Sequence, residues 1–108
     1  MPYEVLLTAD AAADLEEIAG WIGEHDAPAK ADRVARRIEA AVESLARFPE
    51  RGAYPRELLA LGIRDYRETF FKPCRIIYRI EAKRVYVYLI ADGRRDMQSR
   101  LARRLLGG

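Results

Sequence analysis

The sequence predicts a single α+β domain in which a strand and two helices precede a three-stranded antiparallel meander and a short last helix. Two observations lead to this prediction. Apolar residues recur every three to four positions up to about residue 48, the period of amphipathic helices, whereas runs rich in β-branched and aromatic residues follow residue 62. At 108 residues the chain has apolar surface for one core but not for two.

The first half predicts a strand followed by a helical hairpin. Residues 3–8 (YEVLLT) are expected to form the strand, and Thr8 is a candidate N-cap for a helix that ends near His25. A second helix is expected to start at Pro28 and to be stopped by Pro49. Its apolar positions are Ala31, Val34, Ala35, Ile38, Val42, Leu45 and Phe48. Because the intervening break is short, the two helices should lie antiparallel with their apolar stripes facing a common core.

The second half predicts three strands. A connector rich in proline and glycine, with one helical turn at residues 57–60, leads to IRDYRETFF, CRIIYRI and RVYVYLIA, separated by the short breaks Lys72-Pro73 and Ala82-Lys83. Strict alternation puts Cys74, Ile76, Tyr78 and Ile80 on one face, opposite Arg75, Ile77, Arg79 and Glu81. In the last strand it puts Val85, Val87, Leu89 and Ala91 opposite Arg84, Tyr86, Tyr88 and Ile90. We therefore expect one aliphatic face for the helices and one face that mixes aromatic and charged groups.

The tail ADGRRDMQSRLARRLL predicts a turn and a basic amphipathic helix. Asp92-Gly93 should lead the chain out of the last strand, and Asp96 should start the helix. Met97, Leu101 and Leu105 follow at four-residue intervals, beside Arg100, Arg103 and Arg104. A helix of about ten residues is too short to hold alone in water, so it must dock on something. We expect truncation before Asp96 to leave a folded domain.

Charge is distributed unevenly along the chain. Residues 1–60 hold 7 Lys+Arg and 12 Asp+Glu, a net charge of −5, whereas residues 61–108 hold 12 and 5, a net charge of +7, which together give +2. The basic second half suggests an acidic partner, either nucleic acid or an acidic protein segment.

Composition excludes several classes of protein. No window approaches the roughly 20 apolar residues of a membrane span, and the N-terminus lacks a basic leader, so a cytoplasmic protein is expected. Cys74 and His25 are each the only residue of their type. We therefore expect no disulfide, no metal site and no cofactor. We expect Cys74 to be a buried, inert thiol, His25 to cap a helix, and Trp21 to pack in the core or at its rim.

The order of elements, together with several local motifs, resembles the RelE/ParE superfamily of small toxins from type II toxin-antitoxin pairs. LTADAAADLEEIAGWI is similar to the family's first helix, YRETFFKPCRIIYRI to its central hairpin, and VYLIADGRRD to its last strand and exit. The segments PERG, KPCRIIYR and DGRRD resemble the ParE branch most closely, whose members are also known as plasmid stabilisation proteins. The likeness covers nearly the whole chain.

This resemblance implies one of two mechanisms. ParE toxins are described as DNA gyrase inhibitors that block replication, whereas RelE toxins are ribosome-dependent mRNA endonucleases (mRNA interferases). In the nuclease branch the resemblance assigns cationic roles to the positions of Arg75 and Arg95, but the position of its catalytic tyrosine is Leu101, and no Tyr, His or Lys follows Tyr88. RNA cleavage without metal needs a proton-transfer group, and a guanidinium is a poor base at neutral pH.

Gyrase inhibition is therefore the preferred prediction, with a ribosome-dependent, metal-independent endoribonuclease as the alternative and a nucleic-acid-binding module as a third hypothesis. The preferred prediction implies a protein that binds its target and is not an enzyme. The candidate target-binding residues are Arg94, Arg95, Met97, Arg100, Leu101 and Arg104.

The resemblance also implies a cognate antitoxin, which we expect to carry an acidic, amphipathic C-terminal segment and to form a hetero-oligomer with the toxin. The candidate antitoxin-binding residues are Arg67, Arg75, Arg79, Tyr86 and Tyr88. Other roles stay open for these residues. Arg75 and Arg79 are also placed to pair with Glu68 or Glu81 across the strands, and tyrosines in strands commonly serve packing.

Overall fold

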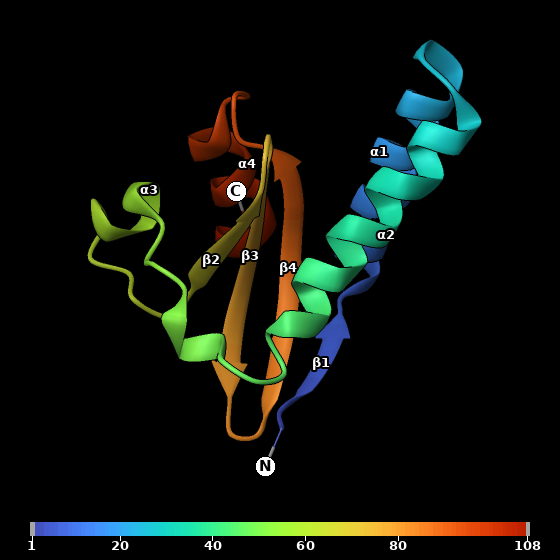
Figure 1. The fold of residues 1–108 in the computed structure, drawn as a ribbon. Helices are drawn as coiled ribbons and strands as arrows, with labels where there is room; N and C mark the ends of the chain where they lie inside the picture. The colour runs from blue at the N-terminus through green and yellow to red at the C-terminus, as the bar shows by residue number, and fades with distance from the viewer. Residues whose placement is uncertain (1, 108) are drawn as a thin grey trace.

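The computed structural model describes residues 2–107 and shows the α+β architecture that the sequence predicts (Figure 1). The sheet has the order β1-β4-β3-β2, in which β1 is parallel to β4 and the other neighbours are antiparallel. The strands are β1 (Glu4–Leu7), β2 (Arg67–Phe71), β3 (Cys74–Glu81) and β4 (Arg84–Asp92). The helices are α1 (Ala9–His25), α2 (Pro28–Ser44), the 3₁₀ turn η1 (Pro49–Arg51), α3 (Arg56–Leu59) and α4 (Met97–Leu106).

The hairpin of α1 and α2 covers one face of the sheet. The Thr8 hydroxyl accepts a hydrogen bond from the Ala11 backbone N–H at 3.1 Å, so the predicted N-cap is confirmed, as is the start of α2 at Pro28. A first core forms between the two layers, from Ala11, Ile38, Val42 and Leu45 of the hairpin and its end and Cys74, Ile76, Tyr78, Val85, Val87 and Ile90 of the sheet. Figure 1 shows the hairpin tilting away from the sheet toward its tip.

Several element boundaries differ from the sequence prediction, among them those of α2, α3 and β2. Helix α2 ends at Ser44, where the next backbone N–H groups bond only three residues back, and Phe48 lies beyond it on the surface. Helix α3 begins one residue before the predicted turn. Strand β2 begins at Arg67, and Ile63 and Tyr66, which were predicted to belong to it, pack instead beside Leu58 and Ile77.

A bulge in β4 overturns the strict alternation expected there. Val87 pairs with Tyr78 and Leu89 with Ile77, so Tyr88 is an extra residue between two ladder positions. Leu89 and Ala91 therefore lie on the face opposite to Val87, whereas the pattern had placed all three together.

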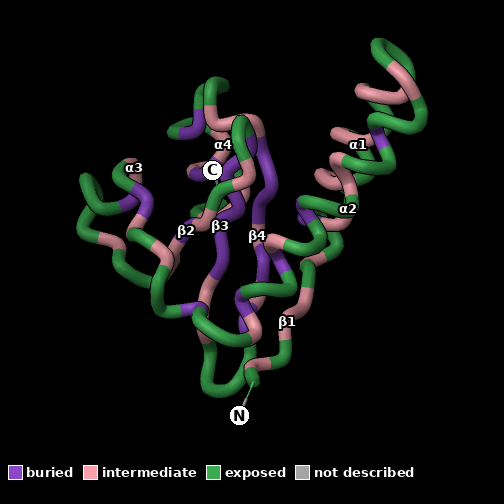
Figure 2. The backbone as a smooth tube through the Cα atoms, in the orientation of Figure 1, coloured by how far each residue is buried: buried purple, intermediate pink, exposed green. Residues whose placement is uncertain are grey.

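The second face of the sheet is covered as well, by α3 and α4. Leu58 of α3 and Met97 and Leu101 of α4 form a second core with Ile77, Leu89 and Ala91. Figure 2 shows the resulting burial along β3 and β4, in contrast to the exposed tip of the hairpin. The face of the sheet that was expected to carry aromatic and charged groups is thus largely buried beneath α3 and α4. No helix in the described part of the chain is long and apolar enough to cross a membrane.

Candidate functional site

The turn between β4 and α4 holds its two adjacent arginines in different ways. The Arg94 backbone N–H and Nε donate to Asp92 Oδ1 at 2.9 and 3.0 Å, and Arg94 Nη2 donates to Oδ2 at 2.6 Å. These bonds lower the pKa of Asp92 to about 2. Arg95 donates only its backbone N–H to the Asp92 carbonyl, at 3.1 Å, and its side chain has no ion pair among residues 2–107. Arg95 is therefore the cation of this turn that is left for a partner.

Helix α4 is capped and docked. Asp96 accepts hydrogen bonds from the Ser99 backbone N–H at 3.1 Å and from its hydroxyl at 2.8 Å, which confirms the predicted helix start. Met97 and Leu101 are only 3% and 1% exposed. The expectation that these two side chains present an apolar surface to a target is therefore wrong, because a helix this short docks through its apolar face.

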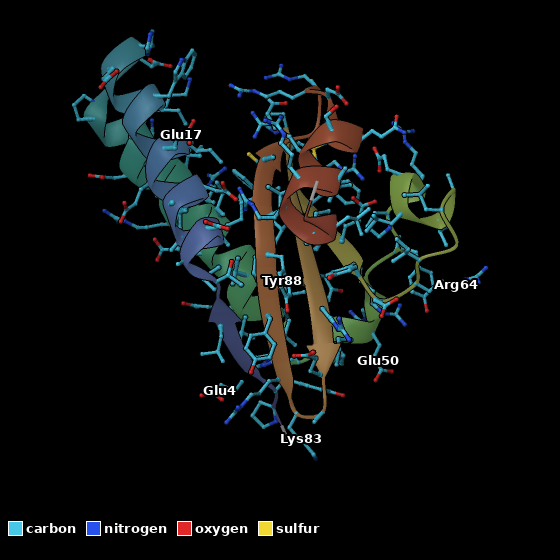
Figure 3. The ribbon with its side chains drawn as sticks, turned by 180° about the vertical axis from the view of Figure 1, so that it is seen from behind. Glu4, Glu17, Glu50, Arg64, Lys83 and Tyr88 are labelled. Carbon is cyan, nitrogen blue, oxygen red and sulfur yellow. The ribbon has the colours of Figure 1, made fainter. Side chains whose placement is uncertain are left out.

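Arg104 serves to anchor α4 to α1. Its Nη1 and Nη2 donate to the Asp14 carboxylate at 2.8 and 3.0 Å, and Nη1 also donates to the Tyr88 carbonyl at 2.7 Å. This pairing raises the pKa of Arg104 and occupies its guanidinium. Within residues 2–107 the neighbouring Arg100 has no such partner. Figure 3 shows α4 crossing β3 and β4, with nitrogen-bearing side chains gathered near the end of the sheet where β4 leads into α4.

Arg75 is buried between two carboxylates. Its Nε donates to Glu68 at 2.6 Å, and Nη1 and Nη2 each donate to Glu57 at 2.8 Å. The hydrogen bonds from Arg75 lower the pKa of Glu57, and the side chain of Arg75 is only 8% exposed. A guanidinium held in this way is not available to bind an RNA phosphate or an antitoxin. The two roles considered for Arg75, as a nuclease cation and as an antitoxin-binding residue, are therefore corrected. The pattern suggested Glu68 as a partner but missed Glu57, which α3 supplies.

Arg67 secures the connector between α2 and β2. Its Nη1 donates to the backbone carbonyls of Glu50 and Gly52 at 3.0 and 2.9 Å, and its guanidinium lies 4.6 Å from the centroid of the Tyr54 ring. These contacts stabilise the fold of the connector and leave little of the guanidinium for an antitoxin.

Arg79, Tyr86 and Tyr88 lie on the α4 side of the sheet. Arg79 is within 3.8 Å of Asp65 and 3.4 Å of Glu81, and it lies over the Tyr66 ring. Tyr88 packs edge-on against Tyr66 with ring centroids 5.5 Å apart, and burial raises the pKa of its hydroxyl. Tyr86 is half-buried and pairs with Arg79 in the strand register. These three residues form one patch, which excludes Arg67 and Arg75.

A groove of about 580 Å³ lies between the helical hairpin and the end of the sheet. No sequence pattern predicted this groove, because it arises where the hairpin diverges from the sheet. Its apolar lining includes Ile18, Trp21, Ile22, Val34, Phe71, Pro73, Cys74 and Ile90, and its charged lining includes Asp14, Glu17, Asp26, Lys72, Arg94, Arg95 and Arg100. Apolar walls thus meet Arg95 of the β4–α4 turn and Arg100 of α4.

Trp21 was expected to pack in the core or at its rim, but it lies 58% exposed beside this groove. Its ring stacks on His25 with centroids 4.5 Å apart, and His25 Nδ1 lies 2.9 Å from the Trp21 carbonyl in the last turn of α1. The position of Trp21 next to the apolar stripe of α1 was the signal in the sequence that could have located the groove.

Cys74 lies in the groove wall, and its thiol is buried as predicted. Burial raises the pKa of this thiol, which disfavours the reactive thiolate. Among residues 2–107 no group of three or more His, Cys, Asp or Glu side chains is arranged to hold a metal ion.

The surroundings of Arg95 suit binding better than proton transfer. Its neighbouring carboxylates are Asp92, whose pKa of about 2 makes it a weak base, and Asp96, which is engaged with Ser99. Leu101, which the resemblance aligns with the nuclease tyrosine, belongs to the second core. The arrangement thus provides cations beside an apolar groove.

Comparisons with known proteins agree with this fold. A family model that describes the ParE toxin of the type II toxin-antitoxin system parDE matches residues 5–97. No curated protein matches the sequence. A solved structure of the chromosomal ParDE toxin-antitoxin system from P. aeruginosa has a TM-score of 0.70 and 22% identity, covering 83% of this chain and 95% of that chain.

The toxin-antitoxin complex RelBE2 from Mycobacterium tuberculosis is also similar, with a TM-score of 0.63 and 21% identity over 85% of this chain and 99% of that chain. At these identities the two structures support the fold, while the family model spans most of the sequence. The chain therefore belongs to the ParE toxin family of type II toxin-antitoxin systems.

Proposed function

We propose that this toxin inhibits DNA gyrase in the cytoplasm and is neutralised by a cognate antitoxin. The observation that carries the proposal is that Arg95, whose side chain has no ion pair among residues 2–107, lines a groove with apolar walls. Leu101 is buried where a nuclease of the superfamily is expected to place its tyrosine, and Arg75 is neutralised by Glu57 and Glu68. Binding to a protein target needs neither group, since it requires only accessible cations and apolar surface.

The proposed target-binding surface consists of Arg95 and Arg100, with Arg94 at its edge. Arg94 is 77% exposed although it pairs with Asp92, so it contacts a partner only by sharing or leaving that carboxylate. Met97, Leu101 and Arg104 support this surface from beneath: the first two fix α4 on the sheet, and Arg104 ties α4 to Asp14.

A supercoiling assay tests the proposal. Purified toxin should block supercoiling of relaxed plasmid by gyrase, and Arg95→Ala and Arg100→Ala should each weaken inhibition, by about tenfold for a central contact. Arg36→Ala is the matched control, because Arg36 is an exposed arginine on α2 and does not line the groove. Normal supercoiling at saturating toxin would refute gyrase as the target.

One observation favours the alternative of ribosome-dependent mRNA cleavage. Arg95 lies where the nuclease branch keeps a cation and has no carboxylate partner among residues 2–107. A cation alone stabilises a phosphate but does not activate the 2′-hydroxyl, so cleavage should be about 10²- to 10⁴-fold below that of an enzyme with its acid and base.

The antitoxin is proposed to dock in the groove between the hairpin and the sheet. Apolar walls fit the nonpolar face of an amphipathic segment, and Lys72, Arg95 and Arg100 fit its carboxylates. A segment in this groove would cover the two proposed target-binding arginines, which explains neutralisation by direct obstruction.

Truncation of Trp21 tests this docking site. Trp21→Ala should weaken antitoxin binding by about 2 kcal/mol, as expected for an aromatic anchor, while leaving the melting temperature nearly unchanged because the side chain is mostly exposed. Leu61→Ala serves as the control, since Leu61 is also an exposed apolar side chain but lies outside the groove. Equal affinities of the two variants, measured by calorimetry, would place the antitoxin elsewhere.

A further inference from the structure

We infer that Arg75 is a positioning residue that sets the Asp92–Arg95 turn and thereby places Arg95 for its target. This inference rests on the proposed function, because Arg95 belongs to the proposed target-binding surface. Arg75 lies on β3, opposite Ala91 near the end of β4. From there its side chain runs beneath the turn.

The head of Arg75 is fixed by groups from two different elements. Glu57 of α3 receives both Nη atoms at 2.8 Å, and Glu68 of β2 receives Nε at 2.6 Å. A bidentate pair and a third charge-assisted bond together define the plane and the position of the guanidinium. The aliphatic part of the side chain therefore has little freedom to move.

The turn is packed directly on that aliphatic part. A Cβ added at Gly93 would lie 2.7 Å from Arg75 Cδ and 2.8 Å from Cγ, distances that atoms in proteins do not adopt. The Gly93 N–H also donates to the Pro73 carbonyl at 2.8 Å. Gly93 thus serves close approach to Arg75, and its φ is not positive.

Arg95 is two residues from this contact and is connected to it through the turn. Its backbone N–H bonds to the Asp92 carbonyl, and the Asp92 side chain binds Arg94, so the turn from Asp92 to Arg95 is a tight hydrogen-bonded unit. Because the turn rests on Arg75, a displacement at Gly93 must move the base from which the Arg95 side chain extends.

A double-mutant cycle distinguishes positioning from a general structural role. The variants are Gly93→Ala, Arg95→Ala and the double variant, and inhibition of supercoiling is measured for each. Gly93→Ala should weaken inhibition by about tenfold, and Arg95→Ala should weaken it by a similar factor. The double variant should be no weaker than Arg95→Ala alone, because both changes remove the same contact between Arg95 and its target. Losses that multiply in the double variant would overturn the inference, as would an Arg95→Ala variant of full potency.

Gly20→Ala provides the matched control, because a Cβ at Gly20 on α1 meets no atom within 4 Å. It should retain full inhibition. If Gly93→Ala does not fold, Glu57→Gln replaces it in the cycle, since this change weakens the hold on Arg75 while leaving Glu68 in place. Glu39→Gln, an exposed substitution on α2, is its control.

Failure of the proposed function can be told apart from failure of this inference. If the unmodified toxin does not inhibit gyrase, the target is wrong, and the same cycle is then measured as growth arrest on expression. Non-additive losses of toxicity would still support the role of Arg75 and Gly93 in placing Arg95. Additive losses in that assay would refute it whatever the target is.

Discussion

At the scale of single residues, charge pairing decides which arginines can function. Arg75, Arg67 and Arg104 each satisfy carboxylates or carbonyls of their own chain, whereas Arg95 does not within the described residues 2–107. Sequence patterns named all four arginines as candidates but could not rank them. The ranking depends on partners such as Glu57 and Asp14, which lie 18 and 90 residues away from the arginines that they bind.

The pairing of Glu57 with Arg75 makes stability depend on pH. The pKa of Glu57 is lowered in the folded state from its usual 4.5, so its contribution is complete above pH 4.5 and is lost as the pH falls through the lowered value. Glu57→Gln should therefore be about 2 kcal/mol less stable than the unmodified chain at pH 7, with a smaller difference at pH 3. Urea unfolding at both pH values measures this, with Glu39→Gln as the control, and a difference independent of pH would contradict the ion pair.

The buried position of Leu101 predicts how the chain responds to an added phenol. Leu101→Tyr puts a larger, polar side chain into the second core, which should cost about 1–3 kcal/mol of stability. We expect no gain in ribosome-dependent RNA cleavage, because Leu101 lies in the second core, whereas Arg95 is exposed in the turn before α4. A folded Leu101→Tyr variant that cleaves RNA faster than the unmodified chain would refute this placement.

At the scale of elements, local signals predicted where helices begin better than where side chains point. The starts of the three long helices were predicted correctly from Thr8, Pro28 and Asp96, because capping residues and proline act on their immediate neighbours. The bulge at Tyr88 was not visible in the sequence, because alternation on both sides of it looks regular. One extra residue moved Leu89 and Ala91 to the other face and created the surface on which α4 docks.

Helix α4 is part of the core, which argues against the expectation that the chain stays folded without it. Removing residues 96–108 would expose Leu58, Ile77 and Leu89 and would leave Asp14 without Arg104. The truncated chain should fail to fold cooperatively and should lose antitoxin binding as well as toxicity, as judged by circular dichroism and calorimetry. Removal of residues 107–108 alone is the control and should be tolerated. A cooperative melting transition in the longer truncation would show that α4 is dispensable.

At the scale of the whole molecule, the sequence predicted the fold, the family and the uneven distribution of charge along the chain. It did not predict the groove. The groove depends on the angle between the hairpin and the sheet, which follows from how Ala11, Ile38 and Val42 pack near one end of the hairpin and leave its tip free. That divergence places the exposed Trp21 across from the cations of the β4–α4 turn. The unevenly charged chain thus presents its free arginines beside an apolar groove.

The central claim is that this surface binds gyrase and does not cleave RNA. The most direct measurement titrates one toxin preparation into two reactions in parallel, supercoiling of relaxed plasmid by gyrase and cleavage of mRNA on programmed ribosomes. We predict inhibition of supercoiling that Arg95→Ala weakens and antitoxin reverses, with intact mRNA over the same concentrations. Rapid mRNA cleavage together with unaffected supercoiling would contradict the account.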